Sequence, residues 1–271
     1  MSIIFNGTTL DSSANIKYNG TSLNKIVFNG VEVWKRYPSI KDIIKINLGD
    51  NYGTKRFKVL NISGSIAEVM LLNTDSSLEY KHNFNDSSVT TTFTGSVTTG
   101  QKYADSALDN YLNNTWYSGL SDEIKTAIVQ KDITQDMWNK LSETPTEKPS
   151  ANNWYYELDN TYYGYYGYAP VGNRYVYAPS FEEIFYCIYG KKYTAARGAH
   201  TMLNYLFADN LTSSSDIYLR SASAAYSDKV PCIYMSGDTN FPAVIGFGDN
   251  PTEERVVRPT FQIDLTNISW T

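Results

Sequence analysis

Residues 216–265 restrict the fold of this chain more than any other stretch. Two apolar runs, 217–221 and 256–265, each carry one arginine, and both are predicted to be buried strands. The residues between them are mostly Ser, Ala, Tyr, Asp, Asn and Gly, interrupted by a short predicted strand at 230–235. A rigid strand frame that holds polar loops is typical of a binding surface, because loops carry recognition while the scaffold positions them. The stretch therefore predicts recognition rather than catalysis.

The charge balance of the chain argues against a nucleic-acid partner. Its 271 residues include 23 Lys and Arg against 28 Asp and Glu, a formal net charge of -5, with no basic cluster. Nucleic-acid binding needs concentrated positive charge. No apolar run approaches the length of a membrane span, so we expect no membrane insertion. The first residues lack the basic region and apolar core of a secretion signal, so we expect no signal peptide.

The first 36 residues predict a separate β-hairpin module. Asn-Gly follows an aromatic residue three times, within 5–7, 18–20 and 28–30. Asn-Gly favours positive φ at both turn positions and so predicts tight hairpin turns. Tyr37-Pro38 breaks the pattern and marks a boundary, which predicts two domains, 1–36 and 37–271. A module this small has little core of its own, so we expect it to dock on something larger; the alternative is an outlying sheet of the main domain.

Strands are predicted directly after the boundary. Segments 43–48, 56–62 and 66–72 have the apolar pattern and the spacing of an antiparallel meander. Residues 73–100 are rich in Ser, Thr and Asn and predict a surface excursion with a hairpin at 89–97.

Helices are predicted in the middle of the chain. Apolar residues recur at helical spacing over 103–112, and this helix is expected to end near residues 113–114. Ser121 predicts the N-cap of a second, short helix. Ser180 and Glu183 have the spacing of a capping box, which begins a third helix that we expect to stop at Gly190.

Tyrosine is unusually abundant, with 23 residues, and is densest at 154–177. Tyrosine buries apolar area while keeping a hydrogen-bonding tip, so it is enriched at interfaces, but aromatic residues are also favoured in half-buried β structure. Gly164 and Gly167 argue against a regular helix. We expect an irregular, partly buried segment with a minority of exposed rings.

The sequence offers little material for catalysis, a metal or a cofactor. His82 and His200 lie in polar settings, so no histidine-based triad is expected. Cys187 and Cys232 are too few for a disulfide framework and have apolar neighbours, which predicts buried thiols. Asp and Asn residues at 237–240 and 248–250 offer oxygen ligands for calcium, but Gly-Asp and Asp-Asn pairs are more often turn formers, so we expect no obligatory metal.

In the C-terminal stretch, the arginines are predicted to be structural and the loop residues to bind a ligand. Arg220 and Arg258 follow apolar strand residues and are expected to bond carboxylates or carbonyls inside the fold. Aromatic anchors beside adaptable polar groups are what a broad binding surface needs. The predicted ligand-binding residues are Tyr218, Ser223, Tyr226, Ser227, Asp228, Tyr234, Ser236, Asp238, Asn240 and Phe241.

Two parts of the sequence resemble known families. Asn29-Gly30-Val31-Glu32-Val33-Trp34 resembles the Asn-Gly-x-x-Val-Trp repeats in tail-associated proteins of phages that infect Gram-positive bacteria. Five further pieces, in order, resemble an uncharacterised domain family of gut clostridia and their phages. They are the strand pair within 57–72, Tyr103-x-x-Ser106-x-Leu108 with Tyr111-Leu112-Asn113, Ala178-Pro179-Ser180-Phe181-Glu182-Glu183-Ile184, Tyr218-Leu219-Arg220-Ser221, and Val257-Arg258-Pro259-x-Phe261-x-Ile263-Asp264-Leu265. Tyr218 stands where that family usually has Trp.

That family is similar to the C-type-lectin fold, in the branch shared with formylglycine-generating enzymes and the variable proteins of diversity-generating retroelements. The resemblance implies an α+β domain in which N- and C-terminal strands pair in an antiparallel sheet, two or more helices flank it, and long C-terminal loops display the ligand surface. It implies a non-enzymatic receptor-binding or variable protein of a phage or prophage tail, which engages a bacterial surface protein or glycan. Residues 1–36 would attach to a tail or baseplate protein. The expected location is the virion tail, or the bacterial cytoplasm before lysis.

Two alternatives stay open. The enzyme branch of the fold resembles a copper- and cysteine-dependent oxidase, for which Cys187 and Cys232 would have to meet on one face. A structural tail subunit would instead use the tyrosine-rich segment as the interface of a homo-oligomer.

Overall fold

Strands make up most of the described structure, and few helices accompany them. The computed structural model describes residues 3–5, 8–10, 17–18, 21–22, 25–28, 31–72, 80–93, 99–141, 155–158, 161–189, 217–223, 227–235 and 243–271. Within these residues the chain is a mixed α+β protein, as predicted.

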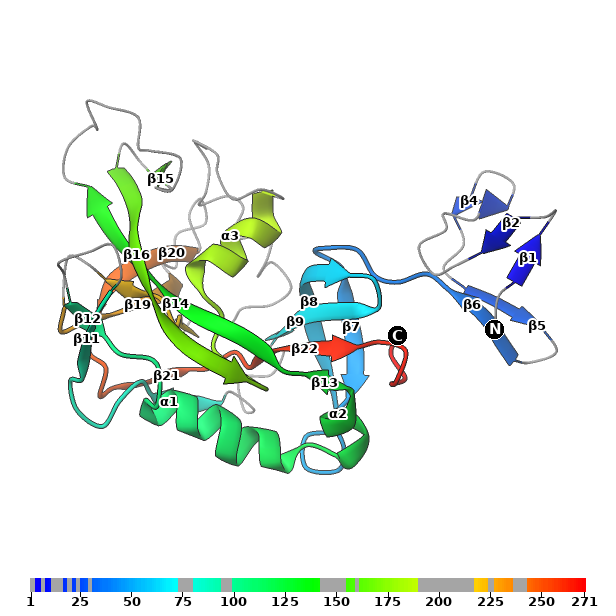
Figure 1. The fold of residues 1–271 in the computed structure, drawn as a ribbon, viewed down its shortest axis with the longest axis horizontal. Helices are drawn as coiled ribbons and strands as arrows, with labels where there is room; N and C mark the ends of the chain where they lie inside the picture. The colour runs from blue at the N-terminus through cyan, green and yellow to red at the C-terminus, as the bar shows by residue number, and fades with distance from the viewer. Residues whose placement is uncertain are drawn as a thin grey trace.

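Hairpins precede the main body of the chain (Figure 1). The antiparallel pairs are β1 (Ile3–Phe5) with β2 (Thr8–Leu10), β3 (Lys17–Tyr18) with β4 (Thr21–Ser22), and β5 (Lys25–Phe28) with β6 (Val31–Lys35). An Asn-Gly pair separates the two strands in each, which confirms the predicted hairpins. Each pair is a two-stranded sheet of its own, and no described strand beyond residue 36 pairs with any of them.

The predicted meander forms three strands of a five-stranded sheet. β7 (Ile43–Asn47), β8 (Thr54–Ser63) and β9 (Ile66–Leu72) pair antiparallel in sequence order. The C-terminal β22 (Thr260–Asp264) pairs antiparallel with β9, and β13 (Ile128–Val129) lies outside β22. Early and late strands of the chain therefore share one sheet.

A second five-stranded sheet carries the C-terminal stretch. Its order is β10 (Lys81–Asn83), β21 (Glu254–Val256), β17 (Ile217–Tyr218), β19 (Val230–Met235) and β20 (Ala243–Asp249). The strands predicted at 217–221 and 230–235 are present, although the first is shorter. The strand predicted at 256–265 is divided between β21 and β22, which lie in different sheets, because Pro259 has no amide hydrogen to donate to a ladder.

The tyrosine-rich segment is strand, not an irregular loop. β15 (Tyr155–Leu158) and β14 (Lys131–Leu141) flank β16 (Thr161–Arg174), and β18 (Ala222–Ser223) pairs parallel with β14. β14 was not predicted at all. Gly164 and Gly167, which argued against a helix, lie in β16 opposite Asn139 and Met137 of β14. The regular pairing of the two strands is interrupted by register shifts beside Thr134 and Trp138.

Shorter elements complete the domain. β11 (Thr90–Thr92) and β12 (Thr99–Gln101) form the hairpin predicted at 89–97, with its second strand further along the chain. α1 (Ala107–Asn110) continues as the π-helical η2 (Tyr111–Trp116) and the 3-10 turn η3 (Tyr117–Gly119), so this helix both begins and ends later in the chain than predicted. The Asn113 side chain donates to the carbonyl oxygens of Asp109 and Val176, and so it bridges to the strand region instead of ending the helix.

The remaining helices begin where the sequence predicted. Ser121 caps α2 (Asp122–Ala127) by accepting a hydrogen bond from the Ile124 amide. α3 (Phe181–Tyr189) begins directly after Ser180. None of the helices in the described part of the chain combines the length and the hydropathy that a membrane-spanning helix needs.

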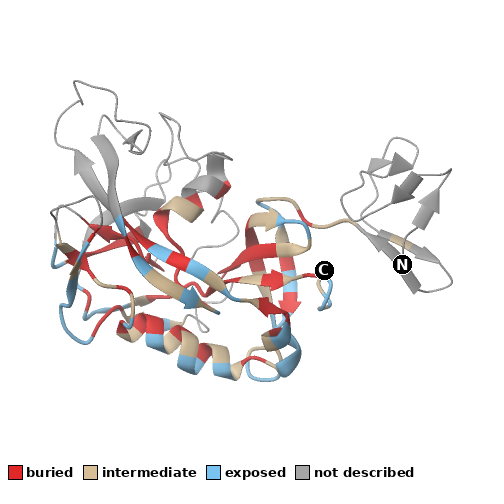
Figure 2. Ribbon diagram, in the orientation of Figure 1, coloured by how far each residue is buried: buried red, intermediate tan, exposed pale blue. Residues whose placement is uncertain are grey.

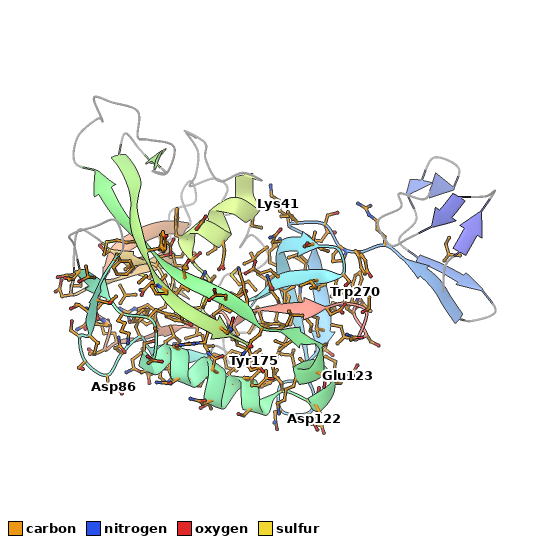
Figure 3. The ribbon with its side chains drawn as sticks, viewed as in Figure 1. Lys41, Asp86, Asp122, Glu123, Tyr175 and Trp270 are labelled. Atoms are coloured by element: carbon orange, nitrogen blue, oxygen red, sulfur yellow. The ribbon has the colours of Figure 1, made fainter. Side chains whose placement is uncertain are left out.

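The main core lies between the first sheet and the helical segment α1–η2 (Figures 1 and 2). Trp116 of η2 is fully buried and lies against Phe261 of β22, with ring centroids 6.0 Å apart. Phe57 contacts Phe261 edge-to-face at 5.3 Å. In Figure 3, side chains fill the space between these layers, while Asp122 and Glu123 lie at its outer edge. The core therefore joins elements from both ends of the domain.

Candidate functional site

A buried arginine–glutamate pair connects α3 to the C-terminal frame. The Glu183 amide donates to Ser180 Oγ at 3.1 Å and the Ser180 amide donates to Glu183 Oε2 at 3.0 Å, which confirms the capping box. Arg220 donates to both Glu183 oxygens at 2.7 Å, and also to the carbonyl oxygens of Thr134 and Ala178 at 2.8 Å. Arg220 is thus structural, as predicted, and Arg258 is likewise buried.

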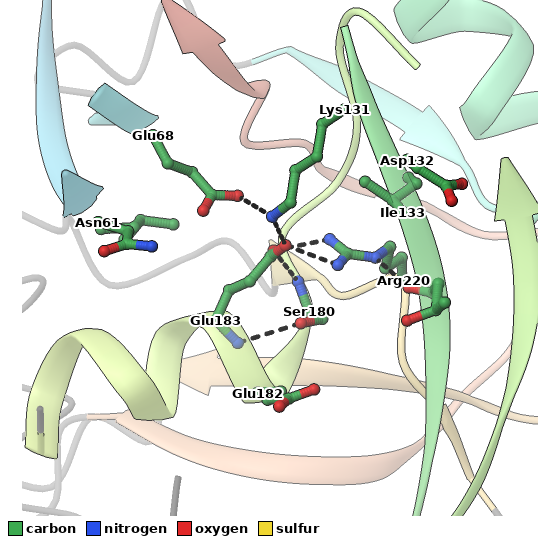
Figure 4. Close-up of a pocket in the computed structure, with 11 residues that line it drawn as sticks. Asn61, Glu68, Lys131, Asp132, Ile133, Ser180, Glu182, Glu183 and Arg220 are labelled. Carbon is green, nitrogen blue, oxygen red and sulfur yellow. Dashed lines mark hydrogen bonds and ion pairs between the residues drawn. The ribbon is translucent and has the colours of Figure 1, made fainter. Parts of the chain in front are cut away.

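Lys131 extends this pair into a network of four charged side chains (Figure 4). Its ammonium donates to Glu68 Oε1 at 2.6 Å and to Glu183 Oε1 at 2.9 Å. The Tyr177 hydroxyl donates to the same Glu68 oxygen at 2.6 Å. Lys131 Nζ and Arg220 Cζ lie 5.3 Å and 5.2 Å from the Tyr177 ring centroid, within cation–π range. The network therefore ties β9, β14, α3 and the residues after β17 together.

Burial and charge shift the pKa values of the two glutamates in opposite directions. Burial, followed by the nearby charge of Glu183, raises the pKa of Glu68 despite its contact with Lys131. Burial also opposes ionisation of Glu183, but Arg220 and Lys131 outweigh it and hold the pKa of Glu183 far below its usual range. Burial lowers the pKa of Lys131, and the two glutamates more than offset this, so its pKa is raised. Glu183 is the more firmly ionised carboxylate because it has two cationic partners.

The network lines a pocket of about 360 Å³. Strand residues of β8 and β14 and the first turn of α3 complete its wall. Its lining residues are Leu60, Asn61, Glu68, Lys131, Asp132, Ile133, Thr134, Ser180, Glu182, Glu183 and Arg220. Most of its lining residues are polar or charged.

The amides at the start of α3 already have acceptors. The Phe181 amide donates to Ser221 Oγ at 2.8 Å, and Ser221 donates to Asp136 at 2.6 Å. The Glu182 amide donates to Asp136 Oδ2 at 3.4 Å. With Ser180 accepting from the next amides, the positive end of this helix has no amide left for an anion.

A family model described as "Domain of unknown function (DUF6273)" matches residues 67–265, which is well over half of the chain. The chain belongs to the DUF6273 family. No curated protein and no solved structure matches the chain. The DUF6273 match contains all four charged residues of the network, whereas the hairpins of residues 1–35 and strands β7 and β8 lie outside it.

Two predicted ligand contacts of the DUF6273 domain lie inside the fold. Tyr218 is fully buried, and its hydroxyl shares its single hydrogen between the carbonyl oxygens of Asn250 and Glu253, each 2.8 Å away. Ser223 is also fully buried. Because neighbouring elements cover both side chains, these residues support a surface rather than forming one. The prediction of ligand contact at these positions is corrected accordingly.

Two other predicted contacts, Ser227 and Asp228, are exposed. They lie in a turn between β18 and β19. The Gln101 side chain donates to the Ser227 carbonyl oxygen at 2.7 Å and to Ser88 Oγ at 2.7 Å, so hairpin β11–β12 holds the backbone of this turn. Tyr234 lies in β19, with its side chain outside the described part of the structure. The other predicted contacts lie outside the described residues: Tyr226, Ser236, Asp238, Asn240 and Phe241.

The cysteines and the described histidine occupy structural positions. Cys187 and Cys232 are buried and neither is in a disulfide, as predicted. Burial raises the pKa of Cys187 to about 11, and its thiol lies 3.5 Å from the Val59 carbonyl oxygen. His82 stacks on Tyr111 with ring centroids 4.6 Å apart. His200 and residues 237–240 lie outside the described residues, and the described ones contain no cluster of three or more His, Cys, Asp or Glu side chains arranged for a metal.

Sequence reasoning missed Glu68, Lys131 and Asp132. A signal for Glu68 was present, because it is the one charged residue within the apolar strand Ile66–Leu72. A buried charge is costly unless it is paired, so such a residue predicts a buried cation nearby. Nothing local to Lys131 shows that it is this cation, because β14 itself was not recognised.

Proposed function

We propose that this chain is a non-enzymatic binding protein whose C-terminal loops recognise a ligand. The observation that carries the proposal is the exposed Ser227–Asp228 turn, whose backbone is fixed by Gln101. An exposed polar turn on a well-anchored backbone keeps its side chains available while losing little conformational freedom on binding, which favours affinity.

The frame beneath the turn supports the same function. Tyr218 anchors β17 to the segment between β20 and β21 through two carbonyl oxygens. Two residues later, Arg220 fixes the chain to α3 and β14. Recognition loops that start from strands held in this way keep their positions, as binding sites on rigid scaffolds do.

In the finer form of the proposal, residues 37–271 are a C-type-lectin-like domain of a phage or prophage tail protein. The mixed α+β fold and the order of the resembling sequence pieces support this form. Residues 1–36 would attach to a tail or baseplate protein, and the loops would engage a bacterial surface protein or glycan. Diversification by a retroelement would concentrate sequence changes between Tyr218 and Asn250 and leave β22 constant.

Cell binding tests the proposed function. The fluorescently labelled chain is incubated with a panel of Gram-positive bacteria, and the bound label is measured with increasing protein concentration. Asp228→Lys reverses the charge of the exposed turn and is expected to weaken binding about tenfold or more if the turn lies within the contact. Asp50→Lys reverses an exposed charge elsewhere and is the matched control.

Saturable binding that Asp228→Lys weakens and Asp50→Lys leaves unchanged supports the proposal. Equal binding by wild type and both variants contradicts a role for this turn. Absence of saturable binding to every strain, together with a stable oligomer in solution, would favour a structural tail subunit instead.

A further inference from the structure

We propose that strand β11 is a docking edge for an extended segment of a partner protein, which adds a third strand to hairpin β11–β12 beside the Ser227–Asp228 turn. This inference rests on the proposed function and narrows its ligand to a protein. The direction of the backbone groups of β11, their exposure and the contact between hairpin and turn support it.

Hydrogen bonds around the hairpin show which backbone groups of β11 point outward. The Lys102 amide donates to the Val89 carbonyl oxygen at 2.7 Å, so these two residues form a hydrogen-bonded pair. In an antiparallel ladder the next pair, Thr90 with Gln101, then points its backbone groups away from the partner strand. The Gln135 side chain agrees with this direction, because it donates to the Gln101 carbonyl oxygen at 2.7 Å from outside the hairpin. The Thr90 amide and carbonyl therefore lie on the outer edge of β11.

This edge is open among the described residues. Alternation along the strand gives the backbone groups of Thr92 the same direction as those of Thr90. Both residues are exposed, and no described residue outside the hairpin forms a hydrogen bond with their backbone. No described strand pairs with the outer side of β11, and the hairpin lies at the end of the main body away from β7 (Figure 1). The edge of β7 differs, because Thr271 exchanges two backbone hydrogen bonds with Lys45.

The exposed residues around the edge suit a peptide. Residues 86–90 are all exposed, and Val89 is 43% exposed. An extended segment along β11 gains backbone hydrogen bonds from Thr90 and Thr92, and an apolar side chain on it covers Val89. A glycan has no row of amide and carbonyl groups at the spacing of a strand, so it cannot use this edge in the same way. The edge therefore favours a protein over a glycan.

Gln101 joins the edge to the turn. Its side chain is fully buried, and its Nε2 donates to Ser88 Oγ and to the Ser227 carbonyl oxygen, each at 2.7 Å. Its Oε1 accepts from the Val89 amide at 3.3 Å. The exposed residues before β11 and the exposed turn thus meet at one side-chain amide. A segment that docks on β11 passes beside Asp228, so it is expected to carry a basic side chain there.

Two substitutions at Thr90 separate recognition of the backbone from recognition of the side chain. Thr90→Pro removes the outward amide hydrogen and no hydrogen bond within the hairpin, which is why proline is tolerated on edge strands. It is expected to weaken binding to the bacterial strain that the wild type binds most tightly by about tenfold or more. Thr90→Val keeps both the amide hydrogen and the branched shape, and it is expected to bind within about twofold of wild type.

Two treatments of the same cells identify the class of ligand. Proteinase K digests proteins at the cell surface, whereas mild periodate oxidises the vicinal diols of glycans. Binding of the labelled full chain is expected to disappear after protease and to persist after periodate. Loss after periodate with persistence after protease would make the ligand a glycan and would overturn the inference.

Val89→Asp keeps the test decisive if circular dichroism shows that Thr90→Pro is unfolded. It removes the apolar contact and adds a negative charge beside the turn, and it is expected to weaken binding about fivefold. The inference is overturned if folded Thr90→Pro binds like wild type, if Thr90→Val weakens binding as much as Thr90→Pro does, or if Val89→Asp has no effect.

The remaining outcomes distinguish this inference from the proposed function. If Asp228→Lys weakens binding while Thr90→Pro and Val89→Asp do not, the turn binds the ligand without β11, and only this inference fails. If no strain is bound, both fail. Sedimentation of the wild-type chain tests a second copy as the occupant: a dimer that Thr90→Pro dissociates would replace the partner protein and overturn the inference.

Discussion

At the scale of single residues, Glu183 combines two roles that sequence reasoning assigned to different features. It closes the capping box with Ser180, which the spacing predicted, and it pairs with Arg220, for which the sequence predicted only some carboxylate or carbonyl partner. The box places the Glu183 carboxylate at the start of α3, and Arg220 follows β17, so the pair forms only when these elements come together. The two roles make Glu183 and Arg220 the residues where substitution is most informative.

Arg220→Leu is expected to lower the free energy of unfolding by about 3–5 kcal/mol, because the substitution leaves Glu183 buried with Lys131 as its sole cation. Urea unfolding followed by tryptophan fluorescence measures this. The control is Lys102→Ala, which breaks an exposed ion pair with Asp105 and should cost no more than about 1 kcal/mol. Similar losses for both variants would contradict a special role for the buried pair.

Glu183 should also make the fold sensitive to acid. Its pKa is held below the ordinary value of 4.5, so the folded chain keeps this carboxylate ionised at a pH where the unfolded chain takes up a proton. The stability it contributes is therefore present above about pH 4.5 and is lost as the pH falls below it. Glu183→Gln should lower stability at neutral pH and flatten its decline below pH 4.5, as urea midpoints across a pH series would show.

Glu68 changes the stability of the fold with pH in the opposite direction. Its pKa is raised above 4.5, so the folded chain takes up this proton first, and stability should rise slightly as the pH falls towards 4.5. Glu68→Gln should remove that rise while leaving the decline below 4.5 in place. If stability declines below pH 4.5 in Glu183→Gln just as in the wild type, other carboxylates cause the acid sensitivity.

At the scale of elements, the sequence predicted those strands, turns and helix starts that residues close together in the chain determine. The Asn-Gly pairs gave the hairpins, the apolar alternation of β7 to β9 gave the meander, and Ser121 and Ser180 gave the helix starts. The ribbon of β14 and β16 was missed, because its strands pair across a long intervening segment and no tight-turn pair marks their connection. Tyr218 was misassigned because an aromatic residue in a strand has the same sequence pattern whether it faces a ligand or the core.

The cap of α2 gives a prediction at this scale. Ser121→Ala removes the acceptor for the Ile124 amide and should cost about 1 kcal/mol of stability. Ser121→Asp keeps an acceptor and places a negative charge at the helix start, so it should restore wild-type stability. Thermal unfolding followed by circular dichroism compares the three proteins. If Ser121→Asp loses as much stability as Ser121→Ala, the lost cap is not the cause of the loss.

At the scale of the whole molecule, the pocket could not be predicted because its walls are distant in sequence. Asn61 and Glu68 come from the meander, Lys131 from β14, Glu183 from α3 and Arg220 from the C-terminal frame. Long-range strand pairing brings them together, above all the insertion of β22 between β9 and β13. Net charge and composition contain no information about which carboxylate meets which cation.

The strand pairing near residue 36 predicts how the chain behaves when the hairpins are removed. Because no described strand beyond residue 36 pairs with β1 to β6, a chain of residues 37–271 should fold alone with the urea midpoint of the full chain. It should also bind cells as the full chain does, since the proposed contacts all lie within it. Residues 37–259 are the contrast, because they lack β22 and with it the buried Phe261 and Ile263 between β9 and β13. This shorter chain should show no cooperative transition. A lower midpoint for residues 37–271 would mean that the hairpins contribute to the core and that the chain is one domain.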